Sequence, residues 1–327
     1  MSNYRLGSLY AGVGGICLGF IQNGFEILWA NEFDKDACNT YKANFDHKLY
    51  EGDVMKLDLE RIEKVDVLAG GFPCQAFSVA GYRKGFKDPR GNHFFRMLDF
   101  VDEMRPKALF FENVKNLVGH DNGNTFKVIK KEILSRNYSF EAKVLNTKDY
   151  ANVPQNRERI FIVAFNLDEV PNADYSFKFP NEEILSLSIS DFISKEKVEE
   201  KFYYREDKYM FEDLKQNIKD QNTIYQWRRQ YVRENKSKVC PTLTANMGTG
   251  GHNVPLIKTD YGIRKLTPRE CFNFQGFPKD FKIDTASNAQ LYKQAGNSVT
   301  VPIISKIAKN IKTVLNGGTC EDPFKLF

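Results

Sequence analysis

With 327 residues and a mass of 37.7 kDa, the chain can hold one large domain or a large and a small one. Hydrophobic residues make up 42% of it, no apolar run approaches the ~20 residues of a membrane span, and the first five residues lack a signal-peptide pattern, so we expect a cytoplasmic protein without membrane spans. A net charge of +5 permits a polyanionic partner without requiring one.

Short apolar runs alternate with amphipathic stretches of helix length from residue 5 to about 165. This is the pattern of βαβ units on a mostly parallel sheet, so we predict an α/β domain over residues 1–167. The strands are expected over 6–10, 26–30, 65–69, 108–111 and 160–165, and the helices over 16–23, 35–44, 93–104 and 125–136. Ligands bind beyond the carboxyl ends of such strands, so polar residues there are candidate site residues.

The alternation stops after about residue 167, and residues 168–262 are expected to form a separate, smaller domain. Within it, residues 221–258 carry six Arg and Lys residues against one glutamate, with aromatic residues interleaved. Residues 263–327 return to an apolar, helix-forming character and end in an expected helix over 301–315. That last segment could pack back on the first domain and complete it.

A glycine-rich turn follows the first expected strand and leads into a helix, which lets a ligand approach the backbone. A dinucleotide fingerprint that begins at Gly12 needs glycine where Cys17 stands, which argues against a nicotinamide oxidoreductase. Glu32 lies 20 residues past Gly12, at the end of the second strand, where a carboxylate can bind ribose hydroxyls. Asp53 ends the next unit and could accept from an adenine amino group. Together these acids describe an adenosine pocket.

Cys74 follows two glycines and a proline just past the strand over 65–69, and it leads into a basic stretch. The chain has six scattered cysteines without a CxxC pair, so neither a zinc site nor a disulfide framework is suggested. Nearby positive charge and backbone N–H groups stabilise a thiolate. Cys74 is therefore the candidate nucleophile.

Two further groups flank expected strands of the same sheet. Glu112 directly follows the strand over 108–111, where burial would raise its pKa and let it hold or deliver a proton. Arg157 and Arg159 precede the strand over 160–165, a position that favours an anionic or carbonyl ligand.

These motifs and their order resemble the cytosine-C5 DNA methyltransferases, particularly the short bacterial enzymes of restriction-modification systems. The resemblance covers nearly the whole chain and rests on six segments, which are Ser8–Gly15, Gly70–Ser78, Glu112–Val114, Gln155–Arg159, Arg264–Glu270 and Gly296–Val299. The fold that it implies is a Rossmann-like S-adenosylmethionine-dependent methyltransferase sheet with helices on both faces. The small domain then becomes a mostly β target-recognition domain.

The resemblance also implies a mechanism, without a metal. Cys74 attacks C6 of a cytosine that has been flipped out of duplex DNA, and C5 then takes the methyl group of S-adenosylmethionine. Glu112 and Arg159 hold the base at N3, the amino group and O2, and Arg157 belongs to the same catalytic motif.

Cofactor and DNA contacts are carried over position by position. The cofactor is expected against Tyr10, Gly12, Gly14, Gly15, Glu32, Phe33, Asp53, Val54, Pro73 and Asn297. Double-stranded DNA is expected against Ser78, Arg90, Gln226, Arg228, Arg229, Arg233, Thr242, Gly250 and Gly251. Tyr10 stands where the family usually has phenylalanine, and His93 stands where it often has an apolar residue, so the role of His93 is open.

Two alternatives remain at this point. One is an RNA (tRNA) cytosine-C5 methyltransferase on the same scaffold, against which the sizeable basic region of residues 221–258 argues. The other is a catalytically idle DNA-binding protein, against which the intact Cys74, Glu112 and Arg159 argue. For the main interpretation we expect a monomer that protects host DNA from a partner restriction endonuclease.

Overall fold

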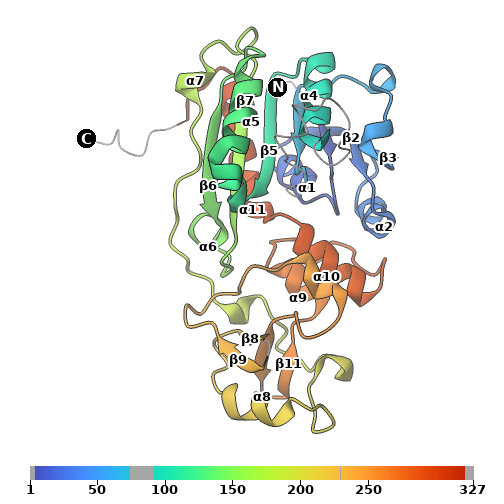
Figure 1. Cartoon of the computed structure of the whole chain (residues 1–327), viewed down its shortest axis with the longest axis vertical. Coiled ribbons are helices and arrows are strands. Elements are labelled where there is room, and N and C mark those ends of the chain that lie inside the picture. Colours follow the sequence, from blue (N-terminus) through green and yellow to red (C-terminus); the bar gives the residue numbers. More distant parts are fainter. Residues whose placement is uncertain (1–3, 74–91, 229, 321–327) are drawn as a thin grey trace, which may run out of the picture. The chain divides into compact units, whose positions relative to one another are not determined.

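The computed structural model describes residues 4–73, 92–228 and 230–320, and it divides into two compact units, which are considered separately (Figure 1). The first unit consists of Met1–Leu145, Glu158–Asn181 and Ile303–Phe327, and the second of Asn146–Arg157 and Glu182–Pro302. The domain boundaries expected at residues 167 and 262 stay a prediction, because compactness alone does not test them.

A seven-stranded sheet forms the centre of the first unit. Its strands are β1 (Arg5–Leu9), β2 (Glu26–Glu32), β3 (Lys48–Glu51), β4 (Val67–Gly70), β5 (Ala108–Val114), β6 (Glu141–Asn146) and β7 (Glu158–Phe165), in the spatial order β3-β2-β1-β4-β5-β7-β6. The strands from β3 to β5 in this order are parallel, whereas β7 runs antiparallel to β5. The expected mostly parallel sheet is therefore confirmed. Because β1, β2, β4 and β5 are parallel, their carboxyl ends lie along the same edge of the sheet.

Helices cover both faces of this sheet because its central strands are apolar on both faces. Phe110 in β5 contacts Phe20 of α1 (Gly15–Ile21), with ring centroids 5.4 Å apart. The next residue, Phe111, points the other way and joins a core with α4 (Asn92–Met104) and α5 (Asn124–Leu134). Gly19 lets α11 (Val301–Leu315) approach α1, since a Cβ on it would lie 2.6 Å from Ile304.

Two other helices of the first unit are α2 (Lys35–Asn44), which follows β2, and α7 (Ala173–Ser176), after β7. Asp34 begins α2 as its N-cap, because its carboxylate accepts from the Ala37 N–H at 3.0 Å. The helices expected over 35–44, 93–104, 125–136 and 301–315 all form, with ends that differ by two residues at most.

The second unit contains a four-stranded sheet with antiparallel pairs, in the order β11-β10-β8-β9. Its elements are α6 (Thr147–Tyr150), α8 (Phe211–Asn217), β8 (Tyr225–Arg228), β9 (Tyr231–Glu234), β10 (Leu256–Thr259), β11 (Gly262–Lys265), α9 (Pro268–Asn273) and α10 (Asn288–Asn297). A small core of Leu214, Tyr225 and Leu256 joins α8 to this sheet. The smaller antiparallel sheet expected from the sequence is confirmed, although helices make up more of this unit than strands.

A buried ion pair fixes the start of α9. Arg264 and Glu270 are 0% and 2% exposed, and the guanidinium donates to both carboxylate oxygens at 2.8 and 2.7 Å. Glu270 also accepts from the Thr267 N–H at 2.7 Å, which completes a capping box at the N-cap Thr267. Two parallel bonds to one carboxylate give this pair a defined geometry.

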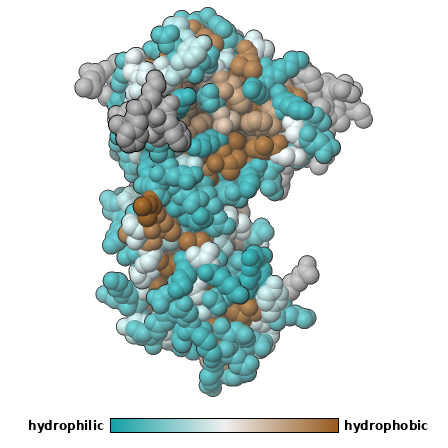
Figure 2. Space-filling view, turned by 90° about the vertical axis from the view of Figure 1, so that its left-hand side faces the viewer, coloured by the Kyte–Doolittle hydropathy of each residue, from teal (hydrophilic) through white to brown (hydrophobic). Residues whose placement is uncertain are grey.

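Hydrophilic residues cover most of the face of each unit that is visible in Figure 2, and apolar residues lie in separate patches. Within the described part of the chain, no helix has the length and apolar character that a membrane crossing requires. The same residues contain no cluster of three or more His, Cys, Asp and Glu side chains arranged to hold a metal ion.

Candidate active site

The glycine-rich turn lies between β1 and α1. Tyr10, Gly12 and Gly14 have φ values of 55°, 57° and 89°, which lie in the left-handed region. A Cβ on Gly14 would lie 2.2 Å from the Phe45 ring, whereas a Cβ on Gly12 would meet nothing within 4 Å. Gly14 is thus required by packing, and the backbone beside Gly12 borders open space. Gly15 is the buried first residue of α1.

Glu32 ends β2 with its carboxylate turned toward this turn. Its Oε2 accepts from the Gly12 N–H at 2.7 Å, and its Oε1 accepts from the N–H groups of Phe33 and Asp34, both at 2.8 Å. An ionised carboxylate has about four acceptor positions, so three main-chain bonds fix its orientation and leave capacity for a hydroxyl. The Phe33 side chain beside it is 76% exposed.

Asp53 follows β3 and caps a short 3-10 helix, Val54–Lys56, by accepting from the Met55 N–H at 3.0 Å. Asn31 supports this segment, since its buried amide donates to the carbonyls of Tyr50 and Gly52 at 2.8 and 2.9 Å. Asn31 was not among the residues expected from the sequence. The feature of the sequence that could have identified Asn31 is its place as a polar residue at the end of an apolar run.

Burial raises the pKa of the Tyr10 hydroxyl, and the negative charge of the nearby Asp53 carboxylate raises it further. Open backbone beside Gly12, an oriented carboxylate at Glu32, an exposed aromatic ring at Phe33 and a second acid at Asp53 therefore gather at neighbouring strand ends. Hydroxyl groups, a planar ring and an amino group are what such a set binds, so the residues fit an adenosine moiety.

The second part of the site pairs β5 with β7. Because β7 runs antiparallel, Arg159 at its start lies opposite Val114 at the end of β5. The Arg159 Nε lies 3.1 Å from Glu112 Oε1, and the two side chains are only 15% and 12% exposed. Glu112 and Arg159, to which the resemblance assigned the same base, thus form a direct ion pair, and their catalytic roles stay a prediction.

The segment after β4 passes beside this pair. A Cβ on Gly71 would lie 3.2 Å from Glu112 Oε2, so that oxygen faces Gly71. Asn113, which is 4% exposed, donates from Nδ2 to the Phe72 carbonyl at 2.8 Å. Strand β5 thereby contacts Gly71 and Phe72, and the next residue, Pro73, is exposed. Cys74 itself lies outside the described residues, as do Ser78, Arg90 and Arg229.

Comparison with known proteins identifies the family to which this chain belongs. The family model of the C-5 cytosine-specific DNA methylases matches residues 4–313, nearly the whole chain. The chain belongs to this family. The identification made from the six motifs is therefore confirmed, and so are the methyltransferase class and the α/β fold class of this DNA methylase.

Two relatives agree with the family, and a solved structure agrees with the fold. The type II methyltransferase M.Bsp6I of Bacillus sp. (strain RFL6) is 57% identical over 312 residues, which cover 94% of this DNA methylase and 98% of the relative. M.HhaI of Haemophilus parahaemolyticus is 38% identical, with 97% and 96% covered. The S. pombe Dnmt2 methyltransferase has a TM-score of 0.73 at 18% identity, covering 96% of this chain and 99% of that one, and it supports the fold.

The second unit of this DNA methylase presents a basic hairpin. In the β8–β9 pair, Gln226 lies opposite Arg233 and Arg228 opposite Tyr231, whereas Trp227 lies opposite Val232 and packs on the small core. Alternation along each strand therefore puts Gln226, Arg228, Tyr231 and Arg233 on one face. On that face Arg228 donates to Gln226 Oε1 at 3.3 Å. The sequence predicted Gln226, Arg228 and Arg233 as DNA contacts, and this contact stays a prediction.

Arg157 has a different environment from Arg159. It is 2% exposed and donates to the carbonyls of Leu243 at 2.7 Å and Gly296 at 3.2 Å, and also to that of Ser298. These acceptors belong to two distant segments of the second unit, one at Leu243 and one at Gly296 and Ser298, so the Arg157 guanidinium joins them. The catalytic role expected for Arg157 stays a prediction.

Four other residues of the second unit were expected to contact DNA or the cofactor. The Thr242 hydroxyl donates to the Asn156 carbonyl at 2.6 Å. Gly250 and Gly251 have φ values of 85° and 68°, and a Cβ on either would find open space or a single distant contact. Asn297 is the exposed last residue of α10. Its expected contact with the cofactor stays a prediction.

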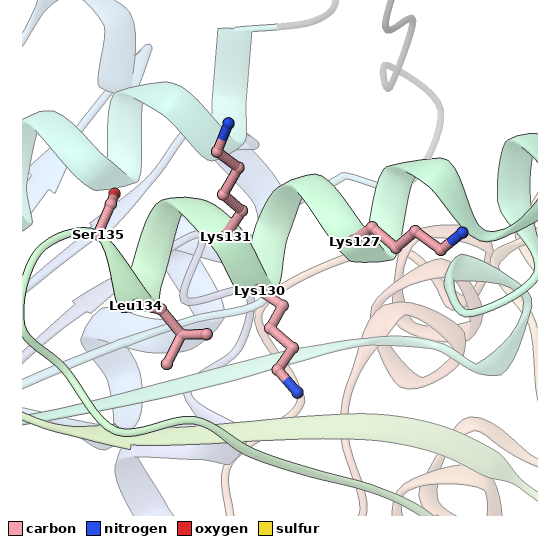
Figure 3. Close-up of a pocket in the computed structure, with 5 residues that line it drawn as sticks. All are labelled: Lys127, Lys130, Lys131, Leu134 and Ser135. Carbon is pink, nitrogen blue, oxygen red and sulfur yellow. The ribbon is translucent and has the colours of Figure 1, made fainter.

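A surface hollow of about 530 Å³ lies along α5, lined by Lys127, Lys130, Lys131, Leu134 and Ser135. In Figure 3 the Lys130 and Lys131 side chains point to opposite sides of the helix, and Lys127 points along it away from both. Their ammonium groups do not converge, so the hollow has no built anion site. These lysines instead offer control positions for tests of DNA binding.

Proposed function

We propose that this DNA methylase transfers a methyl group from S-adenosylmethionine to C5 of one cytosine in a double-stranded recognition sequence and releases S-adenosylhomocysteine. The observation that carries the proposal is the Glu112–Arg159 ion pair at 3.1 Å, with Glu112 Oε2 turned toward Gly71, three residues before Cys74. A nucleophile that follows Gly71–Pro73 would act beside a carboxylate and a guanidinium, which is the set that a cytosine ring requires.

The reaction begins with the Cys74 thiolate, which forms a bond to C6 of the cytosine. The electron pair of the C5–C6 double bond moves toward C5 and the ring nitrogen, so C5 becomes nucleophilic. Bound S-adenosylmethionine supplies the electrophilic methyl carbon. A base then removes the proton from C5, the C5–C6 double bond re-forms, and the thiolate leaves C6.

Glu112 and Arg159 hold the ring during these steps. The Glu112 carboxyl group would bind N3 and the exocyclic amino group, and a proton held there compensates the charge that develops on the ring. The Arg159 guanidinium would donate to O2 and keep Glu112 oriented. Because C5 and C6 are stacked inside a duplex, the cytosine must leave the helix before Cys74 can reach it.

Sequence recognition is assigned to the β8–β9 hairpin of the second unit. Its outward face combines Arg228, Arg233 and Gln226, and Arg suits guanine whereas Gln suits adenine. The type II names of the relatives support a protective role beside a partner restriction endonuclease of the same specificity. We expect the enzyme to act as a cytoplasmic monomer.

The decisive experiment uses duplex DNA that carries 5-fluorocytosine at the methylated position, which bisulfite sequencing of host DNA would first locate. Fluorine replaces the proton that must leave C5, so the enzyme should remain covalently attached and resist denaturation. Cys74→Ser should form no adduct and show no methyl transfer, while DNA binding stays within about tenfold. Cys320→Ser, at a buried cysteine of the first unit far along the chain, is the matched control.

A wild-type enzyme without an adduct, or a Cys74→Ser variant with near-normal turnover, would defeat the covalent mechanism. The same assay with tRNA in place of duplex DNA tests the RNA alternative, since methylation of tRNA alone would exclude the DNA substrate. An enzyme that binds DNA and methylates neither substrate would support the idle DNA-binding protein.

A further inference from the structure

Tyr10 has a backbone conformation that needs support. It is the residue between β1 and the glycine-rich turn, and its φ of 55° lies in the left-handed region, where a residue with a side chain is strained. Such conformations persist where the surroundings hold them, often at ligand sites. The surroundings of Tyr10 are therefore informative.

One residue holds the Tyr10 side chain at three points. The Tyr10 hydroxyl lies 3.0 Å from His93 Nδ1 and 3.3 Å from the His93 carbonyl oxygen. The two rings meet edge to face, with centroids 5.5 Å apart and planes at 79°. A phenol has one proton, so it donates to one of these acceptors. If that acceptor is the carbonyl, a protonated Nδ1 can donate back to the phenol oxygen, and both contacts become hydrogen bonds.

His93 lies in the first turn of α4, and the next turn of that helix holds a second segment of the pocket. Arg96 donates from Nε to the Val54 carbonyl at 3.2 Å and also donates to the Leu57 carbonyl, while its side chain is only 13% exposed. The first two turns of α4 thus contact the turn after β1 through Tyr10 and the segment after β3 through Arg96. These segments form two sides of the adenosine pocket.

We propose that His93 is a positioning residue for the adenosine moiety of S-adenosylmethionine, and that it acts by fixing the Tyr10 ring at the edge of the pocket. This inference rests on the proposed function, because it assumes that the pocket takes this cofactor. A ring that is already oriented loses little freedom when a ligand packs against it, so the pair strengthens binding by preorganisation. His93 itself need not touch the ligand.

Titration calorimetry with S-adenosylhomocysteine on the full chain tests the pair. His93→Leu and Tyr10→Phe should each raise the Kd about fivefold, the loss expected for one hydrogen bond. The double variant should bind no more weakly than the weaker single variant, because each substitution breaks the same bond. His93→Asn, whose amide can still meet the Tyr10 hydroxyl, should recover most of the affinity. His120→Leu, at a histidine that is hydrogen-bonded to Thr125, is the control and should leave the Kd unchanged.

A Kd within twofold of wild type in both single variants would overturn the inference, and so would independent, multiplying effects in the double variant. Thermal unfolding without ligand distinguishes a role in stability from a role in binding. A lower unfolding midpoint with an unchanged Kd would mean that His93 only stabilises the fold, and it would also overturn the inference. The inference would also be overturned if His93→Asn bound S-adenosylhomocysteine no more tightly than His93→Leu. If wild-type protein binds no S-adenosylhomocysteine, the proposed function falls and this inference falls with it.

Discussion

The sheet edge of the first unit and the β8–β9 hairpin of the second hold their polar side chains in opposite ways. Glu112, Asn113 and Arg159 are nearly buried, and each has a named partner within the protein. Arg228 and Arg233 are exposed, and the bond from Arg228 to Gln226, at 3.3 Å, is long. The same kind of side chain, arginine, is thus fixed in one region and extended into solvent in the other.

The difference matches the functions that we propose for the two regions. A group that acts on one atom of a base has to be placed before the substrate arrives, because misplacement of about 1 Å can cost two orders of magnitude in rate. A group that binds phosphate or a base edge gains its main partner only in the complex, and long flexible side chains suit that purpose. The comparison predicts large effects from the buried group and graded effects from the hairpin.

The largest effect is expected at Glu112. Glu112→Gln removes the charge that pairs with Arg159 and the capacity to hold a proton, so single-turnover methylation should slow by about 10³-fold. Binding of duplex DNA should change by less than about threefold. Glu141→Gln, at an exposed position of β6, is the matched control. Near-normal methylation by Glu112→Gln would remove the distinction between the two regions.

The cofactor pocket should show intermediate effects. Glu32→Ala and Asp53→Ala should each weaken S-adenosylmethionine binding by about 1 to 3 kcal/mol, if each leaves a charge-assisted hydrogen bond unmade. Calorimetry measures the change, and Glu60→Ala, at an exposed acid nearby in the chain, should leave it unaltered. Unchanged affinity in both pocket variants would mean that the adenosine site lies elsewhere.

The hairpin arginines should show smaller effects that divide into two kinds. If Arg228 or Arg233 binds phosphate, its replacement by Ala should weaken cognate and non-cognate DNA alike and reduce the salt slope by about one. If it reads a base, near-cognate sites should gain methylation relative to the true one. Lys130→Ala on α5 serves as the control cation. A salt slope and specificity unchanged in both hairpin variants would place DNA recognition outside this face.

The smallest effect concerns a partly buried polar cluster of the first unit. The Tyr41 hydroxyl donates to Cys17 Sγ at 3.1 Å and lies against His47 Nε2. Burial lowers the pKa of His47 below its ordinary value of 6.5. As pH falls below about 6.5 the unfolded chain therefore takes up a proton that the folded chain resists, and the unfolding free energy falls. Chemical denaturation between pH 5 and 8 should show a weaker fall for His47→Gln, and equal pH slopes would refute this assignment.

The strands show what the sequence pattern can and cannot predict. The five strands expected from apolar runs are the five interior ones, β2, β1, β4, β5 and β7. Both strands at the edges were missed. β3 has only four residues and has exposed charged residues, Lys48 and Glu51, at its two ends. In β6 only Leu145 is buried, and its other residues are exposed or half-buried. An edge strand faces solvent and carries polar side chains, so its apolar signal is weak.

The site could be predicted where position along a strand decides geometry. Glu112 follows its apolar run and Arg159 precedes the next, and the antiparallel pairing of these strands brings them together. The partners of Asn113, Arg157 and His93 could not be predicted, because each contacts a segment distant in the sequence. Only the folded chain determines which carbonyl or hydroxyl lies within reach of such a side chain.

The Arg157 guanidinium has a consequence for how such an enzyme can change its target. Its acceptors are the carbonyls of Leu243, Gly296 and Ser298, which are main-chain atoms. A carbonyl is present whatever side chain a residue carries, so substitutions at position 243 leave this joint intact as long as the backbone path is kept. The segment that contains the hairpin can therefore diverge in sequence, or be exchanged between relatives, without loss of its attachment. If the hairpin reads the target sequence, as we propose, specificity can evolve while the framework that supports it stays the same.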